Sequence, residues 1–124
     1  MDPRRAFGNE GESLAAEYLR RKGMTIREKQ VRTEHGEIDL VCEQDGELVF
    51  VEVKTRQTDT SGPPEASITP SKFRSMKKCA EAYVMERALE AKPWRLDVVS
   101  IWLKEGQAEP EILHFEAVDR PYGN

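Results

Sequence analysis

The sequence has no apolar run longer than a few residues, whereas a membrane-spanning helix needs about 20. Its first residues, Met1 to Arg5, lack the apolar core of a secretory signal peptide. It has only two cysteines, Cys42 and Cys79, which without an export signal we expect to be buried free thiols rather than a disulfide framework. Internal repeats and low-complexity segments are also missing. These absences predict a cytoplasmic protein with no membrane partner.

The sequence also has no excess of positive charge: its 124 residues carry a net charge of −4. This argues against a protein that coats nucleic acid by bulk electrostatic attraction. The charge is unevenly distributed, however: residues 37–53 hold six acids and no bases, and residues 54–78 hold six bases and two acids. An acidic stretch beside a basic one suits metal-assisted chemistry on phosphates, although ordinary surface variation explains it equally well.

The order of the expected elements favours one α/β domain over residues 1–124, with a mixed β-sheet and flanking helices. Asn9 is a suitable N-cap for a helix over 9–23, and Thr69 for a second helix that runs to about Ala91. We expect a flexible loop at 57–69 and a C-terminal tail at 119–124. The expected extended segments are residues 24–32, a hairpin around Asp45-Gly46, and residues 95–103 and 112–118.

The expected hairpin contains the acidic and basic residues that are candidates for a functional site. Asp45-Gly46 is typical of a two-residue type I′ turn, and that turn places Asp39 directly opposite Glu52. Opposed side chains of an antiparallel pair have Cβ atoms about 4.5–5.5 Å apart. Two carboxylates that close repel each other unless positive charge lies between them. Lys54 follows two residues later on the face of Glu52. The register therefore predicts a divalent-metal site.

Side-chain alternation assigns the two faces of the hairpin. It places Ile38, Leu40 and Cys42 on one face of the first strand and Asp39 on the other. In the second strand, valines alternate with Glu52 and form a core face. The opposite face is apolar near the turn and ionic away from it. Burying the charged side chains of such a face costs free energy unless they are paired or solvated. The ionic end favours a functional site.

The pattern of Asp39 followed by Glu52-Val53-Lys54 resembles the PD-(D/E)XK nuclease superfamily. A longer phrase is similar to the YraN family: Gly36-Glu37-Ile38-Asp39-Leu40 with Val49-Phe50-Val51-Glu52-Val53-Lys54-Thr55-Arg56. The same resemblance includes Gly8-Asn9-Glu10-Gly11-Glu12, Lys72, and Arg95-Leu96-Asp97-Val98-Val99. It covers nearly the whole chain, and the YraN family is distantly related to archaeal Holliday-junction resolvases. The sequence departs from the family at Gln30, where members often carry Asn, and from the superfamily motif at Ile38, which replaces a proline.

The resemblance implies a restriction-endonuclease-like domain with a metal-binding hairpin. It implies that Asp39 and Glu52 bind Mg²⁺ or Mn²⁺, with the Val53 carbonyl as a further ligand. Lys54 would lie near the scissile phosphate, and Glu12 would reach the same centre from the first helix. Each assignment has a structural alternative: a solvated sheet edge for the two acids, a salt bridge to Glu37 for Lys54, and a capping box for Glu12.

Other charged residues are less specific. We interpret Asp97 as a surface or strand-end acid and His35 as a solvated loop histidine. A charged helix face is usually only solvated, but four basic residues are candidate phosphate contacts: Arg56, Lys72, Arg74 and Lys77.

Our leading hypothesis is an endonuclease that hydrolyses DNA phosphodiesters with Mg²⁺ or Mn²⁺. The analogy with resolvases suggests structured or branched DNA and a homodimer. Two alternatives remain: a catalytically inactive nucleic-acid-binding module of the same fold, and a protein-interaction domain whose acidic hairpin meets a basic partner.

Overall fold

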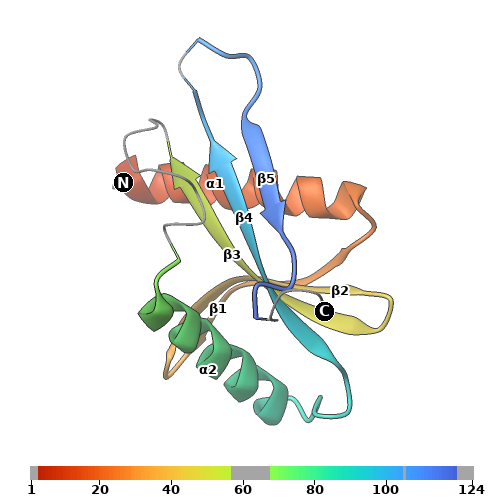
Figure 1. The fold of residues 1–124 in the computed structure, drawn as a ribbon. Helices are drawn as coiled ribbons and strands as arrows, with labels where there is room; N and C mark the ends of the chain where they lie inside the picture. The colour runs from red at the N-terminus through yellow and green to blue at the C-terminus, as the bar shows by residue number, and fades with distance from the viewer. Residues whose placement is uncertain (1–2, 57–67, 105, 120–124) are drawn as a thin grey trace.

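Two helices lie on opposite faces of one five-stranded sheet (Figure 1). This computed structural model describes residues 3–56, 68–104 and 106–119, so most of the predicted loop and tail lies outside the described residues. The strands are ordered β1-β2-β3-β4-β5, with β3 and β4 parallel and the other neighbours antiparallel. The elements are α1 (Pro3–Arg21), β1 (Thr25–Thr33), β2 (Gly36–Gln44), β3 (Glu47–Arg56), α2 (Pro70–Glu86), β4 (Trp94–Trp102) and β5 (Glu111–Phe115).

Helix α1 begins at Pro3 rather than at Asn9. Proline suits a first helical turn because the N–H it lacks has no partner there, whereas the N-cap preference of asparagine suggested a later start at Asn9. Asn9 is therefore an internal residue, and its Oδ1 accepts a hydrogen bond from Gln30 Nε2 at 3.1 Å. Neither α1 nor α2 is long and apolar enough to span a membrane.

Helix α2 begins where the sequence predicted. Thr69 Oγ1 accepts a hydrogen bond from the Lys72 amide at 3.1 Å, and Pro70 occupies the first turn. The buried stripe of this helix contains Met76, Ala80, Tyr83 and Val84, with Phe73 only partly buried. Cys79 belongs to the same stripe, and both it and Cys42 are buried free thiols as expected.

The end of α2 comes at Glu86, earlier than the predicted Ala91. Ala88 adopts a left-handed backbone with φ of 54°, its amide bonds Met85 O, and the Leu89 amide bonds Val84 O at 2.9 Å. This pair of bonds is a Schellman motif, in which the left-handed position is usually glycine. With alanine there, the sequence carries no visible stop signal.

The last strand also ends earlier than predicted, at Phe115 rather than Val118. Ala117 has a φ of 51°, and its amide donates to Asp97 Oδ1 at 2.9 Å. The Val118 amide then bonds Leu96 O. The chain therefore turns back over β4 instead of extending β5.

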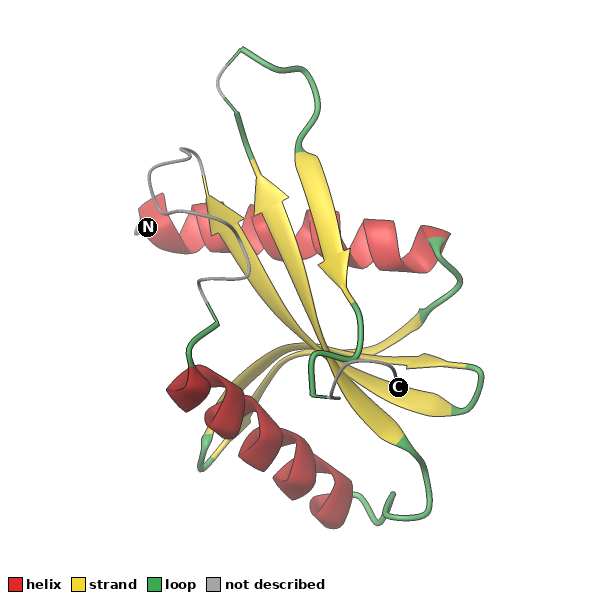
Figure 2. Cartoon of the chain, viewed as in Figure 1, coloured by secondary structure: helices red, strands yellow, loops and turns green. Residues whose placement is uncertain are grey.

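The core has two parts, one on each face of the sheet, and Figure 2 shows the two helices that cover these faces. The α1 face buries Ala15, Ala16, Leu19, Leu40, Cys42, Val49, Val51, Val99 and Ile101. The α2 face buries Val31, Ile38, Val41, Leu48, Phe50, Met76, Cys79, Ala80, Tyr83, Val84, Leu96 and Val98. The sheet is therefore covered on both faces, as expected for an α/β domain that contains a parallel strand pair.

The central hairpin has the predicted register. Gln44 pairs with Glu47, and the ladder continues to Leu40 and Val51. Asp45 and Gly46 both have positive φ angles, 53° and 81°, as a type I′ turn requires.

The predicted faces of the hairpin are wrong at Ile38. This residue packs in the α2-side core, whereas Leu40 packs in the α1-side core, so the alternation reverses between them, at Asp39. In β1, the residue opposite this point is Gln30, which has a left-handed φ of 51°. A left-handed residue inside a strand breaks the regular alternation of side chains. Asp39 and Gln30 therefore face each other where both strands change face.

Candidate metal and phosphate site

Asp39 lies where β2 and β3 stop pairing. Beyond the last pair of the ladder, the Val53 amide donates a hydrogen bond to Asp39 Oδ2 at 2.8 Å. The carboxylate is thus held against the backbone of β3. Burial of the group, and then the negative charge of Glu52, raise the pKa of Asp39 to about 7. A nearby cation would favour the charged form of this carboxyl group.

Glu52 is the second carboxylate of the site and is only 6% exposed. Its negative charge contributes to the raised pKa of Asp39, so the two acids lie close together, although the ladder ends at Leu40 and Val51, one residue before the predicted pair. Glu52 Oε1 lies 3.1 Å from Lys72 Nζ and 3.5 Å from Lys54 Nζ. Positive charge therefore reaches Glu52 both from α2 and from its own strand.

Glu12 faces the same centre from α1. Burial raises the pKa of Glu12, a hydrogen bond from Gln30 partly offsets this, and the charges of Glu37 and Glu52 raise it further. The charge of Glu12 in turn contributes to the raised pKa of Asp39. Because Glu12 lies well inside α1 rather than in its first turn, the capping-box interpretation is wrong.

Gly11 explains how α1 approaches β3 so closely. A Cβ atom at Gly11 would lie 1.9 Å from Thr55 Oγ1 and 2.9 Å from Thr55 Cβ, distances that no side chain tolerates. Glycine in a helix interior costs about 1 kcal/mol relative to alanine, but here its missing side chain lets the helix pack against the strand. The neighbouring Glu12 is thereby brought toward the carboxylates of the hairpin.

The donor set fits a small hard cation that keeps much of its water. Among the described residues, no three His, Cys, Asp or Glu side chains form a group that could hold a metal ion. Mg²⁺ commonly uses one or two carboxylates and several waters, so Asp39 and Glu52 are sufficient as an anchor. The predicted backbone ligand, Val53, is the residue whose amide binds Asp39.

The four candidate phosphate contacts lie at different distances from this centre. Lys72 is bonded to Glu52 and is therefore part of the site rather than of a solvated helix face. Lys77 is exposed on α2, and Arg74 lines a neighbouring cavity. Arg56 lies at the end of β3, where its guanidinium is stacked on Trp102 at 4.3 Å from the ring centroid.

Two alternative interpretations can now be compared with the structure. Glu37 forms an ion pair with Arg32 at 3.6 Å, whereas Lys54 bonds Glu52, so the predicted cross-strand pair of Lys54 with Glu37 is not what holds Lys54. His35 is exposed in the turn between β1 and β2, as predicted.

Gln30 is a site residue that the motif analysis missed. Its side chain donates to Asn9 Oδ1 and to Glu12 Oε2, which links β1 to α1 beside Asp39. Its left-handed backbone is a conformation that asparagine adopts more readily than most residues. The resemblance described above had marked this position as one where the sequence departs from the family pattern.

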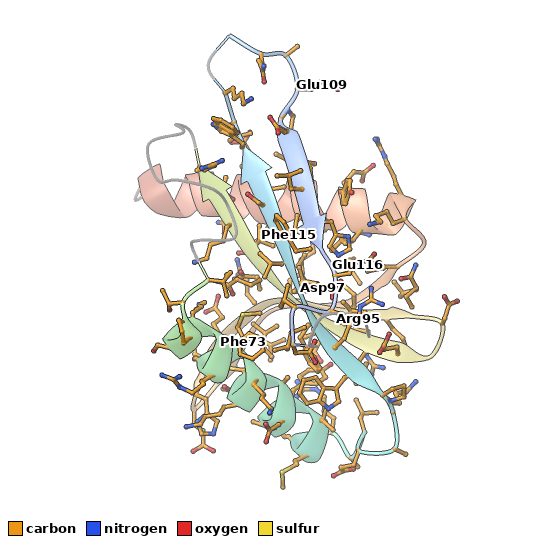
Figure 3. All side chains as sticks on the ribbon, in the orientation of Figure 1. Phe73, Arg95, Asp97, Glu109, Phe115 and Glu116 are labelled. Atoms are coloured by element: carbon orange, nitrogen blue, oxygen red, sulfur yellow. The ribbon has the colours of Figure 1, made fainter. Side chains whose placement is uncertain are left out.

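Asp97 is not the surface acid that the sequence predicted. Its side chain is fully buried and bonds His114 at 2.7 Å, Arg95 at 3.0 Å and the Ala117 amide. Figure 3 labels Asp97 and Arg95 on β4. Burial alone would raise the pKa of Asp97, but the hydrogen bonds from these three partners outweigh it and hold the pKa below its ordinary value. The group joins β4 to β5 and to the segment that follows, so its role is structural.

Comparison with known proteins places the chain in a family. The model of the uncharacterised protein family UPF0102 matches residues 11–101. A UPF0102 protein of Syntrophomonas wolfei is 45% identical over 105 residues, which cover 85% of this chain and 91% of that protein. UPF0102 proteins of Geotalea uraniireducens and Anaeromyxobacter dehalogenans are 39% and 41% identical, over 90% and 94% of this chain and 87% and 85% of theirs. The matched region contains Glu12, Asp39, Glu52, Lys54 and Lys72. The chain therefore belongs to the UPF0102 family, the YraN-type family that its motifs resemble.

Proposed function

We propose that this protein is a metal-dependent endonuclease that hydrolyses phosphodiester bonds of DNA. The observation that carries the proposal is the convergence of Asp39 and Glu52 with two lysines, Lys54 and Lys72, at one point of the structure. A buried carboxylate, Glu52, beside a half-buried one, Asp39, suits a divalent cation, and two adjacent ammonium groups suit a phosphate. Packing alone gives no reason to place these two acids and two lysines together, so the cluster favours a functional role.

Each side chain then has a role. Asp39 and Glu52 hold Mg²⁺ or Mn²⁺, with Val53 as a backbone ligand by analogy with PD-(D/E)XK nucleases. When bound, the ion polarises the phosphate and supplies an activated water. Lys54 and Lys72 donate to phosphate oxygens and stabilise the negative charge that develops on them. Glu12 lies close enough to influence the charge of Asp39 and borders the centre on the α1 side.

The arrangement of the elements is compatible with a restriction-endonuclease-like fold. The antiparallel hairpin β2–β3 carries the acids, α2 follows β3 and contributes Lys72, and β4 returns parallel to β3. Helices cover both faces of the sheet. This topology, together with the motif in the hairpin, supports the superfamily assignment that the sequence resemblance implies.

One observation favours a second function, a nucleic-acid-binding module that does not cut. Lys54 and Lys72 both form ion pairs with Glu52, so side chains of the protein itself compensate the charge of this carboxylate. A protein that uses Glu52 only to position two phosphate-binding lysines would have the same geometry. Metal binding is what separates the two functions.

The test is cleavage of a labelled panel of linear duplex, single strand, flap and four-way junction, each with Mg²⁺ and with Mn²⁺. Wild type is compared with Asp39→Asn and Lys54→Met, and with Met85→Ala as the control, because Met85 is 71% exposed on α2. We expect cutting by wild type and the control, and a loss of at least about 100-fold in both site variants, since the positioned charges that stabilise a transition state are worth that much.

DNA binding is measured on the same proteins by fluorescence anisotropy in Ca²⁺. Binding without cutting in wild type would favour the non-catalytic module. Absence of both binding and cutting would leave the protein-interaction domain, which a pull-down with basic peptides would examine. The homodimer predicted by analogy with resolvases is tested by multi-angle light scattering with and without DNA.

A further inference from the structure

A cavity of about 450 Å³ lies beside the candidate metal site. Val98 of β4 and Phe115 of β5 form part of its lining on the sheet, and Phe73 and Arg74 form part of its lining on α2. Figure 3 shows Phe73 and Phe115 on these separate elements. Ile68 and Val118 add further apolar surface. The cavity therefore combines aromatic and aliphatic walls with one cationic side chain.

Two residues that line the cavity are direct neighbours of residues in the candidate metal site. Val98 is the register neighbour of Glu52 across the parallel pair β3–β4, and neighbouring strands lie about 4.8 Å apart. On α2, Phe73 directly follows Lys72, whose ammonium group bonds Glu52. A base in the cavity and a phosphate beside the two lysines could thus belong to the same nucleotide.

We propose that this cavity receives an unpaired nucleobase next to the scissile phosphate. This inference rests on the proposed nuclease function and specifies its substrate: DNA with a base that is unpaired, or easily unpaired, at the cleavage position. A nucleotide carries a planar aromatic base, whose faces are apolar, and a phosphate in one small unit. The base would enter the cavity that Phe73 and Phe115 help to line, and the phosphate would lie beside Lys54 and Lys72.

The charges around the cavity agree with this occupant. Arg74, an exposed residue of α2, lies at the cavity and can bind the next phosphate of a strand that enters it. Base–aromatic stacking does not depend on the sequence, because every base has a π-face. The site would therefore select for strand structure rather than for base identity. A base stacked within intact duplex cannot enter a cavity without being extruded, and extrusion costs a few kcal/mol.

The first experiment removes the base rather than the protein side chain. A single-stranded oligonucleotide with one mapped cleavage position is compared with versions that carry an abasic residue on either side of it. Stacking of one base contributes enough that we expect kcat/KM to fall about 5- to 100-fold for one of the two abasic positions. If neither position changes kcat/KM, the proposal is wrong, while the nuclease function stands.

A variant cycle locates the effect in the cavity. Phe73→Leu keeps an apolar side chain in the partly buried position but removes the aromatic ring, so the penalty for the abasic residue should shrink to about twofold or less. Met85→Ala, on the solvent side of the same helix, should keep the full penalty. An equal penalty in Phe73→Leu and wild type would overturn the assignment of the cavity.

A binding measurement tests, without catalysis, whether the cavity receives the base. Methyl-labelled Asp39→Asn protein is titrated with thymidine 5′-monophosphate and with deoxyribose 5-phosphate. We expect the methyl signals of Val98 and Val118 to shift with the nucleotide and not with the sugar phosphate. Shifts with both, or with neither, would overturn the proposal. Lack of any DNA binding in the anisotropy assay would instead contradict the proposed function itself.

Discussion

Asp39 is held in the fold at a cost in stability. Its pKa of about 7 is above the value of about 3.9 that an unperturbed aspartate has, so the folded protein binds a proton more tightly than the unfolded chain does. The sign follows from linkage: this group costs nothing below about pH 4, the cost grows as the pH rises, and it is complete above pH 7.

We therefore predict that Asp39→Asn stabilises the protein at high pH. Asparagine is isosteric and can still accept the hydrogen bond from the Val53 amide. The free energy of unfolding should rise by about 1–3 kcal/mol at pH 8 and change little at pH 4, as measured by urea denaturation. Glu81→Gln, at an exposed position of α2, is the control. A gain of the same size at both pH values would contradict the argument.

Asp97 has the opposite effect on stability. Because its pKa is lowered in the folded state, the stabilisation it provides is present above the unfolded pKa and is lost as the pH falls through the folded pKa. We predict that Asp97→Asn lowers the free energy of unfolding by about 2–4 kcal/mol at pH 7, since Arg95 and His114 lose a buried charged partner.

The same variant should differ from wild type less as the pH falls, when Asp97 is protonated in both states. Chemical denaturation between pH 3 and pH 7 measures this. Metal binding per folded molecule should be unchanged, because the bonded partners of Asp97 are not residues of the Asp39–Glu52 site. An Asp97→Asn protein as stable as wild type at pH 7 would disprove the structural role.

At the scale of elements, the distance between α1 and β3 depends on one glycine. We predict that Gly11→Ala destabilises the protein by about 1–3 kcal/mol, the usual cost of overpacking, although alanine is the better helix former. It should also lower the cleavage rate, because α1 carries Glu12. Thermal unfolding and the cleavage assay measure the two effects.

Thr55→Gly provides the test of mechanism for Gly11→Ala, because it removes every Thr55 side-chain atom that the new methyl group meets. In the double variant the cost of Gly11→Ala should shrink or disappear, which would appear as a favourable coupling energy in a double-mutant cycle. Additive effects of the two substitutions would show that the clash is not the cause.

At the scale of the whole molecule, the candidate site joins α1, β2, β3 and α2, so a bound ion would link elements on both faces of the sheet. We predict that Mn²⁺ stabilises the fold at pH 8. A ligand at 100 times its Kd stabilises by about 2.7 kcal/mol, which thermal unfolding detects as a rise in Tm. Asp39→Asn and Glu52→Gln should lose this rise, and Met85→Ala should keep it. An equal rise in all four proteins would place the ion elsewhere.

Much of the fold follows from local patterns. The turn at Asp45-Gly46 fixed the hairpin register, and Thr69 with Pro70 fixed the start of α2, because both signals act through the backbone of a few adjacent residues. The ends of α2 and β5 were mispredicted because alanines, Ala88 and Ala117, occupy left-handed positions. Tertiary contacts impose that conformation, and an alanine in the sequence gives no signal of it.

The sequence by itself determined the register of the hairpin, since the residue count of a tight turn sets which residues are opposed, and it thereby predicted that Asp39 and Glu52 lie close together. Only the tertiary structure showed how they meet: the strands change face at Asp39 and Gln30, and the Val53 amide holds the carboxylate. It also decided that Lys72 joins Glu52 and that Asp97 is buried. The physical reason is the separation along the chain of the residues that interact. Turns and caps depend on neighbours in the chain, whereas burial and ion pairing depend on residues that only packing brings together.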